Sequence, residues 1–243
     1  MALSFIPPRG WIPFISPRGV AFMGARAQAI LPLALVIGVL SFVWTEIALN
    51  FTFHWVTAVD LGNGLAQPEN FHLILPTAFI SWGMFFMAGG DNAAFGKVLV
   101  ACIFGTVGAL VVMPLSFKTA ALPDFWGIAL WVGIGAFVLV AILIAGDWYY
   151  VAGTFPAFAA TFLWWIATGL DGWAANGGGV GNSISALGDP ATAGSGAFGG
   201  VISTPWAYVW LNTLVTLVCG CILGIVSAKV AAAITPKPRA AEA

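Results

Sequence analysis

Six stretches of the chain are continuously apolar over about 20 residues, the length that an α-helix needs to cross the hydrocarbon core of a bilayer. They cover residues 27–49, 71–89, 95–115, 125–145, 148–170 and 205–234. The runs do not alternate between apolar and polar residues, and this favours helices over the strands of a membrane β-barrel. The sequence therefore predicts an all-α membrane protein with six transmembrane helices.

The low charge of the chain supports this assignment. Of 243 residues, eight are Lys or Arg and nine are Asp or Glu, which is 7 % of the chain, whereas a soluble domain carries about 25 %. So few charges cannot keep the surface of a folded protein of this size in water. The composition excludes a soluble enzyme, a nucleic-acid-binding protein and a disordered chain.

The distribution of basic residues predicts the topology, because cytoplasmic loops of membrane proteins are enriched in Lys and Arg. Seven of the eight cations fit one arrangement and Lys118 does not; the seven are Arg9, Arg18, Arg26, Lys97, Lys229, Lys237 and Arg239. Loops 50–70 and 171–204 contain no Lys or Arg and are expected on the outer face. We expect a multi-pass protein of the bacterial inner membrane with both termini in the cytoplasm.

Two segments are expected to flank the membrane domain, which spans residues 27–234 and includes the outer loops 50–70 and 171–204. Residues 1–26 contain four prolines and are expected to lie in the membrane interface, the alternative being a disordered basic tail. Residues 235–243 form a cytoplasmic tail. The glycine-rich loop 171–204 is either a cap packed over the outer face or a loop that binds a partner.

The second and fifth apolar windows align without a gap at an offset of 79 residues. The matched positions are Ala78-Phe79 with Ala157-Phe158, Phe85-Phe86 with Trp164-Trp165, Ala88 with Ala167, and Gly90 with Gly169. Each window also has a proline near its start, Pro76 or Pro156. The predicted topology makes the halves 27–115 and 125–234 inverted three-helix repeats, an arrangement found in many transporters, where interrupted helices mark the binding site.

A route for a small solute is therefore predicted between the second and fifth helices. Hydroxyl, amide and aromatic groups suit an uncharged or weakly polar solute better than an ion, and Glu46 lies near the outer mouth. The expected pathway residues are Glu46, Thr77, Ser81, Trp82, Phe86, Thr161, Trp165 and Asn212.

Other chemistry is poorly supported. His54 and His72 are the only histidines and are expected to titrate on the outer side. Their spacing resembles no metal motif, and the glycines of loop 171–204 lack the lysine of a phosphate-binding loop. The cysteines Cys102, Cys219 and Cys221 are expected as buried small apolar residues. We therefore expect no metal, no cofactor and no enzymatic activity.

The stretches PTAFISWGMFFMAGG (76–90) and VAGTFPAFAATF (151–162) resemble an uncharacterised family of small polytopic bacterial inner-membrane proteins. The resemblance implies a compact multi-pass protein and brings no catalytic residues with it. This chain differs from the family in its N-terminal segment and in its glycine-rich loop.

Two functions remain open from the sequence. The first is a channel or transporter for a small neutral or weakly polar solute. The alternative is a non-catalytic accessory subunit of a larger membrane complex, which could be pigment-associated because a single histidine can ligate the magnesium of a chlorin. The expected partners are the lipid bilayer, the solute, and either further copies of the chain or other subunits of a complex.

Overall fold

A computed structural model of the protein describes residues 17–54, 70–119, 121–123, 125–146, 148–170 and 204–235. In this part of the chain every regular element is helical, which confirms the predicted all-α class. The elements are α1 (Pro17–Leu49), the π-helix η1 (Asn50–His54), α3 (Leu75–Met87), α4 (Asn92–Lys118), α5 (Trp126–Ala141), the 3-10 helix η2 (Ile142–Ala145), α6 (Val151–Ala167) and α8 (Trp206–Ile234).

Some of the predicted segments lie outside the described residues. These are residues 1–16 of the interfacial segment, most of the outer loops 50–70 and 171–204, and the tail from residue 236 onward.

Four of the helical segments are long and apolar enough to cross a membrane. They are Ile30–Thr52, Asn92–Lys118, Trp126–Ala145 and Trp206–Ile234, in agreement with four of the six predicted windows. The other two windows are helical only in part, because α3 has 13 residues and α6 has 17. At 1.5 Å per residue, α3 is about 20 Å long, shorter than the roughly 30 Å hydrocarbon core.

Proline and glycine explain why α3 is short. Pro76 is the second residue of α3, a position where a missing N–H costs nothing because the first turn of a helix has no partners for its N–H groups. The preceding residues 71–74 are not helical. At the other end, Gly89 (φ +123°) and Gly90 (φ +71°) adopt left-handed backbone conformations that end the helix. Pro156, in contrast, lies inside α6.

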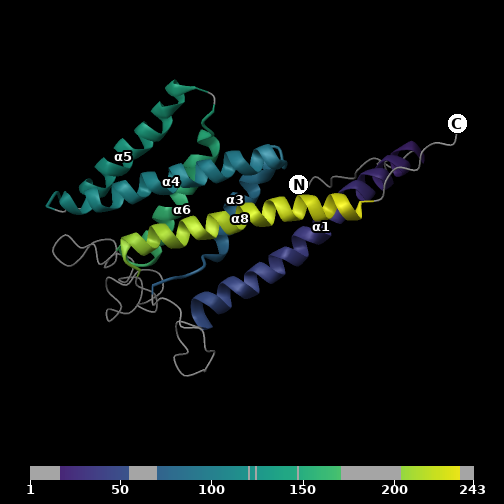
Figure 1. Ribbon diagram of the computed structural model, residues 1–243, viewed down its shortest axis with the longest axis horizontal. Coiled ribbons are helices and arrows are strands. Elements are labelled where there is room, and N and C mark those ends of the chain that lie inside the picture. Colours follow the sequence, from purple (N-terminus) through teal and green to yellow (C-terminus); the bar gives the residue numbers. More distant parts are fainter. Residues whose placement is uncertain are drawn as a thin grey trace, which may run out of the picture.

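The bundle is built around α4 and α8, which run antiparallel side by side (Figure 1). The short helix α3 packs mainly against α8, and the short helix α6 packs mainly against α4. The outermost helices follow the same division, since α1 lies against α8 and α5 lies against α4. The start of α1 and the end of α8 lie at the same end of the bundle.

Glycines allow the closest of these contacts. A Cβ atom at Gly105 of α4 would collide with the carbonyl oxygen of Thr154 and with Ala157 on α6. A Cβ atom at Gly220 of α8 would likewise collide with the carbonyl oxygen of Ala78 on α3. The backbones of each pair therefore approach more closely than any other residue would allow.

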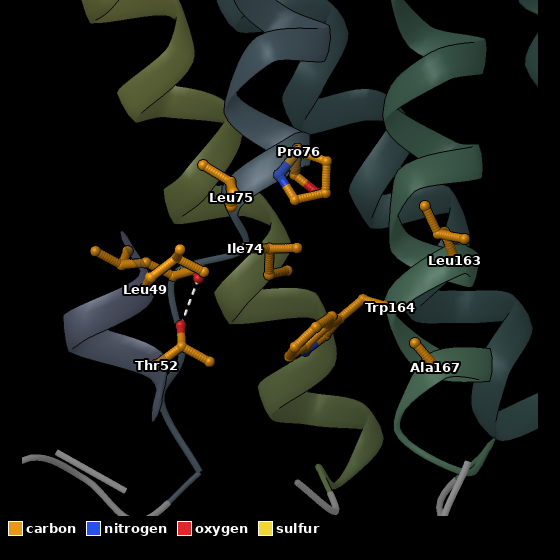
Figure 2. Close-up of a pocket in the computed structure, with 10 residues that line it drawn as sticks. Leu49, Thr52, Ile74, Leu75, Pro76, Leu163, Trp164 and Ala167 are labelled. Carbon is orange, nitrogen blue, oxygen red and sulfur yellow. Dashed lines mark hydrogen bonds between the residues drawn. The ribbon is translucent and has the colours of Figure 1, made fainter. Parts of the chain in front are cut away.

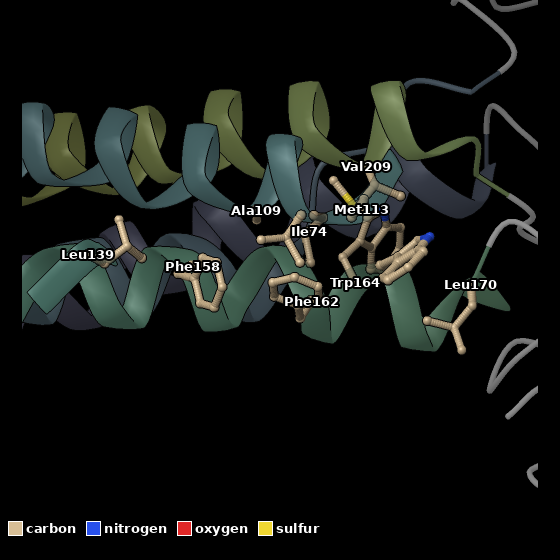
Figure 3. Packing of buried hydrophobic residues seen from close by; sticks show 11 residues of the cluster. Ile74, Ala109, Met113, Leu139, Phe158, Phe162, Trp164, Leu170 and Val209 are labelled. Atoms are coloured by element: carbon tan, nitrogen blue, oxygen red, sulfur yellow. The ribbon is translucent and has the colours of Figure 1, made fainter. Parts of the chain in front are cut away.

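Aromatic side chains fill the space between α4 and α6. The rings of Phe158 and Phe162 on α6 lie 4.8 Å apart in an edge-to-face arrangement, and Trp165 continues the row at 5.9 Å from Phe162. Figure 3 shows Phe158, Phe162 and Trp164 following one another along α6 beside Ala109 and Met113 of α4. This part of the core is filled by side chains.

The outer faces of α1 and α5 are apolar and exposed. Phe42 on α1 is 73 % exposed, Phe137 on α5 is 72 % exposed, and Ile144 on η2, which continues α5, is 90 % exposed. In water such a surface would be strongly unfavourable. It fits contact with lipid chains or with another apolar protein surface.

Candidate functional site

The irregular segment Asn70–Ile74, which precedes α3, is held in place by side chains from other helices. Four side chains bind its backbone or that of the first residue of α3. Two of the bonds come from α8: the amide of Asn212 donates to the carbonyl of Asn70 (2.9 Å), and the hydroxyl of Thr216 accepts from the N–H of Ile74 (3.2 Å). The other two come from α1 and η1: the indole of Trp44 donates to the carbonyl of Leu75 (3.1 Å), and the hydroxyl of Thr52 donates to the carbonyl of Leu73 (2.5 Å).

These bonds explain how a non-helical backbone can lie among apolar helices. Inside a bilayer each unpaired backbone N–H or C=O group costs several kcal/mol, so irregular backbone occurs only where protein or a water-filled cavity satisfies it. Here α1, η1 and α8 supply the missing partners. The second predicted membrane window is thus an irregular segment joined to a short helix.

Several buried polar atoms beside this segment have no hydrogen-bond partner in the described structure. They are Nδ1 of His72, Oγ1 of Thr77, Oδ1 of Asn212 and Oγ1 of Thr213, and all four side chains are at most 1 % exposed. The imidazole of His72 lies edge-to-face with Trp164 of α6, with ring centroids 6.1 Å apart. Buried polar atoms are nearly always hydrogen-bonded in folded proteins, so such a group marks a place where water or a solute could bind.

A partly open cavity of about 290 Å³ lies at the irregular segment, and Thr77 is the one of these four residues that lines it (Figure 2). It is bounded by the end of α1 with η1, by the start of α3 and by the end of α6. Its lining residues are Leu49, Thr52, Leu73, Ile74, Leu75, Pro76, Thr77, Leu163, Trp164 and Ala167. Figure 2 shows Trp164 reaching from α6 toward Ile74 at one side of the cavity.

The lining is apolar apart from the threonines Thr52 and Thr77 and the indole N–H of Trp164. No charged side chain belongs to it. The charged side chains whose exposure is described all lie on the surface; they are Glu46, Asp91, Lys97, Lys118 and Lys229. A cavity of this size and lining fits a small molecule that is mostly apolar and uncharged.

The predicted pathway residues do not line this cavity together, and Thr77 alone of the eight belongs to its wall. Ser81 and Trp82 face α8: the Ser81 hydroxyl donates to the carbonyl of Leu217 (2.7 Å), and the Trp82 indole donates to the hydroxyl of Ser227 (3.0 Å). Both are buried. They join α3 to α8.

The other predicted residues lie in different surroundings. The Thr161 hydroxyl donates within α6 to the carbonyl of Ala157 (3.0 Å), while Trp165 packs against Phe117 of α4. Phe86 contacts Phe85 near the end of α3. Glu46 is exposed on α1, where its carboxylate accepts a hydrogen bond from the amide of Asn50 (3.0 Å). Asn212 is buried and binds Asn70, as described above.

Of the two histidines, His72 is buried and His54 is the last residue of η1, with a side chain outside the described part. Among the described residues, no group of three or more His, Cys, Asp and Glu side chains is arranged to hold a metal ion.

Sequence reasoning missed the side chains that hold the irregular segment, namely Trp44, Thr52 and Thr216. One signal was available. Thr216 follows Asn212 by four residues and Thr213 by three, so the three polar residues share one face of an otherwise apolar helix.

Comparison with protein-family models, with curated proteins and with solved structures gives no match to this chain.

Proposed function

We propose that the protein crosses the membrane six times as two inverted three-helix halves, 27–115 and 125–234. The packing of the helices supports this. If α1, α3 and α4 correspond to α5, α6 and α8, every main contact has a counterpart: α3 on α8 corresponds to α6 on α4, and α1 on α8 corresponds to α5 on α4. The contact between α4 and α8 has no separate counterpart, because the two-fold relation exchanges these two helices with each other.

Individual residues support the same correspondence. The close approach of Gly105 to Ala157 is matched by that of Gly220 to Ala78, and Ala78 and Ala157 are separated by the offset of 79 found in the sequence. The aligned Gly90 and Gly169 both adopt left-handed backbone conformations, with φ of +71° and +87°, where the short helices end.

The proposed orientation has both termini in the cytoplasm of a bacterium. Lys97 lies near the start of α4 and Lys229 near the end of α8, and because these helices are antiparallel, both lysines are at the same end of the bundle (Figure 1). That end also holds the start of α1. A shared end for these cations is the arrangement that the positive-inside rule favours.

Within this frame we propose a channel or transporter for a small, neutral, largely apolar solute, with no enzymatic step. The observation that carries the proposal is the cavity at the irregular segment before α3, with the unpaired hydroxyl of Thr77 in its wall. Short or interrupted spans at corresponding positions of two repeats are where transporters of this kind bind their substrates. The Thr77 hydroxyl orients the solute, and the apolar wall excludes ions.

The test is flux into vesicles that contain the purified protein. Glycerol, 1,2-propanediol and urea serve as neutral probes, and sodium chloride serves as the ionic probe. Ala167→Phe places a ring in the cavity, while Ala159→Phe, on an exposed position of the same helix, adds the same bulk elsewhere. We expect a neutral probe to enter faster than into protein-free vesicles, and Ala167→Phe but not Ala159→Phe to abolish the difference.

If no probe enters faster than into protein-free vesicles, the transport proposal is wrong. Equal flux through both variants would place the route away from the cavity. Glu46→Gln is measured alongside, because this carboxylate was predicted at the mouth.

A second candidate function is that of a non-catalytic accessory subunit of a larger membrane complex. The aromatic filling between α4 and α6 and the exposed apolar faces of α1 and α5 favour it. Purification in mild detergent separates the two. A partner subunit or a pigment absorbance band at stoichiometric amounts supports the accessory role, and a protein free of both supports transport.

A further inference from the structure

Two cysteines from opposite halves of the chain meet at the crossing of the central helices. Cys102 lies on α4 and Cys221 on α8, and both are fully buried in one cluster with Ala157 and Leu217. Their thiols are close enough to interact, and Ser81 of α3 lies near Cys221. The third cysteine, Cys219, is half-buried and packs with a different cluster, around Trp44 and Ala48.

We propose that Cys102 and Cys221 form a dithiol–disulfide pair whose oxidation covalently joins α4 to α8. A disulfide requires two cysteines whose backbones already lie close together and whose side chains point toward one another. The two thiols lie in one buried cluster and interact there, as the second requirement asks, and α4 packs directly against α8, which brings the two backbones together. Cys219 is only two residues from Cys221, which on a helix turns it to another face.

The reaction is a two-electron oxidation. Each thiol gives up its proton, the sulfur atoms form one S–S bond, and two electrons pass to an acceptor. With the azo compound diamide as the oxidant, the N=N bond takes up the two electrons and the two protons and becomes a hydrazine. The product joins residues 119 positions apart in sequence and therefore ties one half of the chain to the other.

This pair is separate from the candidate solute site. Neither cysteine lines the cavity beside α3, so the proposal stands whether or not the protein moves a solute. Its consequence is mechanical, because the disulfide fixes the position of α4 relative to α8.

The experiment counts free thiols in the full-length protein, reduced and then kept folded in mild detergent. After diamide treatment and removal of the oxidant, the chain is unfolded in SDS and labelled with a maleimide mass tag. We expect the number of labelled thiols to fall from three to one, and peptide mapping to find Cys102 linked to Cys221.

Cys219→Ser is the matched control, and it should fall from two labelled thiols to none. Cys102→Ser should keep both of its remaining thiols, because Cys219 and Cys221 cannot bridge. The proposal is overturned if folded wild-type protein keeps three labelled thiols after diamide, or if Cys219 appears in the intramolecular cross-link. Because wild type and Cys219→Ser decide the result, the test does not depend on the folding of variants at the buried pair.

Discussion

Replacing Thr216 with valine removes one hydroxyl group while keeping the branched shape of the side chain. That hydroxyl is the hydrogen-bond acceptor for the backbone N–H of Ile74, at 3.2 Å, and both residues are buried. Valine leaves the N–H without a partner among apolar side chains. An unsatisfied buried donor of this kind costs about 1–3 kcal/mol, so we expect the variant to lose about that much free energy of unfolding.

Thr213 provides the control for this change. It lies three residues earlier on α8 and is equally buried, but its hydroxyl has no hydrogen-bond partner in the described structure. Thr213→Val is the same chemical change without the loss of a bond, and it removes a polar atom that burial disfavours. We expect no loss of stability, or a gain of up to about 1 kcal/mol.

The measurement is the unfolding of purified protein in mild detergent, followed by circular dichroism as SDS is added. The quantity of interest is the difference between the two variants. If Thr216→Val is as stable as Thr213→Val, the hydroxyl does not hold the irregular segment, and the account of how the chain tolerates a non-helical stretch among apolar helices fails.

Three further variants, the first with a control on the same helix, test the packing, the polar contacts and the surface. Gly105→Ala should lower the free energy of unfolding by about 1–3 kcal/mol, because the added Cβ collides with backbone atoms of α6. Gly96→Ala, on the same helix, adds a Cβ in open space and should leave stability unchanged or slightly raised in the same SDS titration. Ser227→Ala leaves the buried indole N–H of Trp82 without its acceptor and should cost about 1–3 kcal/mol; an unchanged unfolding midpoint would show that the indole finds another partner. Glu46 lies on the surface, so Glu46→Gln should change the free energy of unfolding by less than about 0.5 kcal/mol. A larger change would mean that the carboxylate is buried in the membrane-embedded protein.

Hydropathy alone predicted the long helices well. The windows for α4, α5 and α8 agree with the structure to within a few residues at each end, because a continuous apolar run of about 20 residues has few alternatives to a helix. Pro76 and the glycines at 89 and 90 are also visible in the sequence as helix boundaries.

The irregular segment before α3 could not be predicted in the same way. Residues 71–74 read Phe-His-Leu-Ile, a run as apolar as the helix that follows, and periodicity cannot distinguish the two over four residues. Its conformation depends on Thr216 and Asn212, which are 142 residues away from the backbone groups that they bind. The Cys102–Cys221 contact has the same origin, since it arises from the crossing of two helices whose relative positions the sequence does not state.

The apolar wall of the cavity gives a physical basis for selecting the solute that we propose. An ion entering between Leu163, Ile74 and Trp164 would lose its hydration shell and meet no charged side chain in the lining, and the cost of moving a charge into such surroundings far exceeds what two threonine hydroxyls return. A small neutral molecule with one or two polar groups loses much less hydration. It can then recover a hydrogen bond from Thr77, whose hydroxyl is buried without a partner. Thr77→Val should therefore weaken discrimination among neutral solutes while leaving ions excluded, because the apolar wall remains.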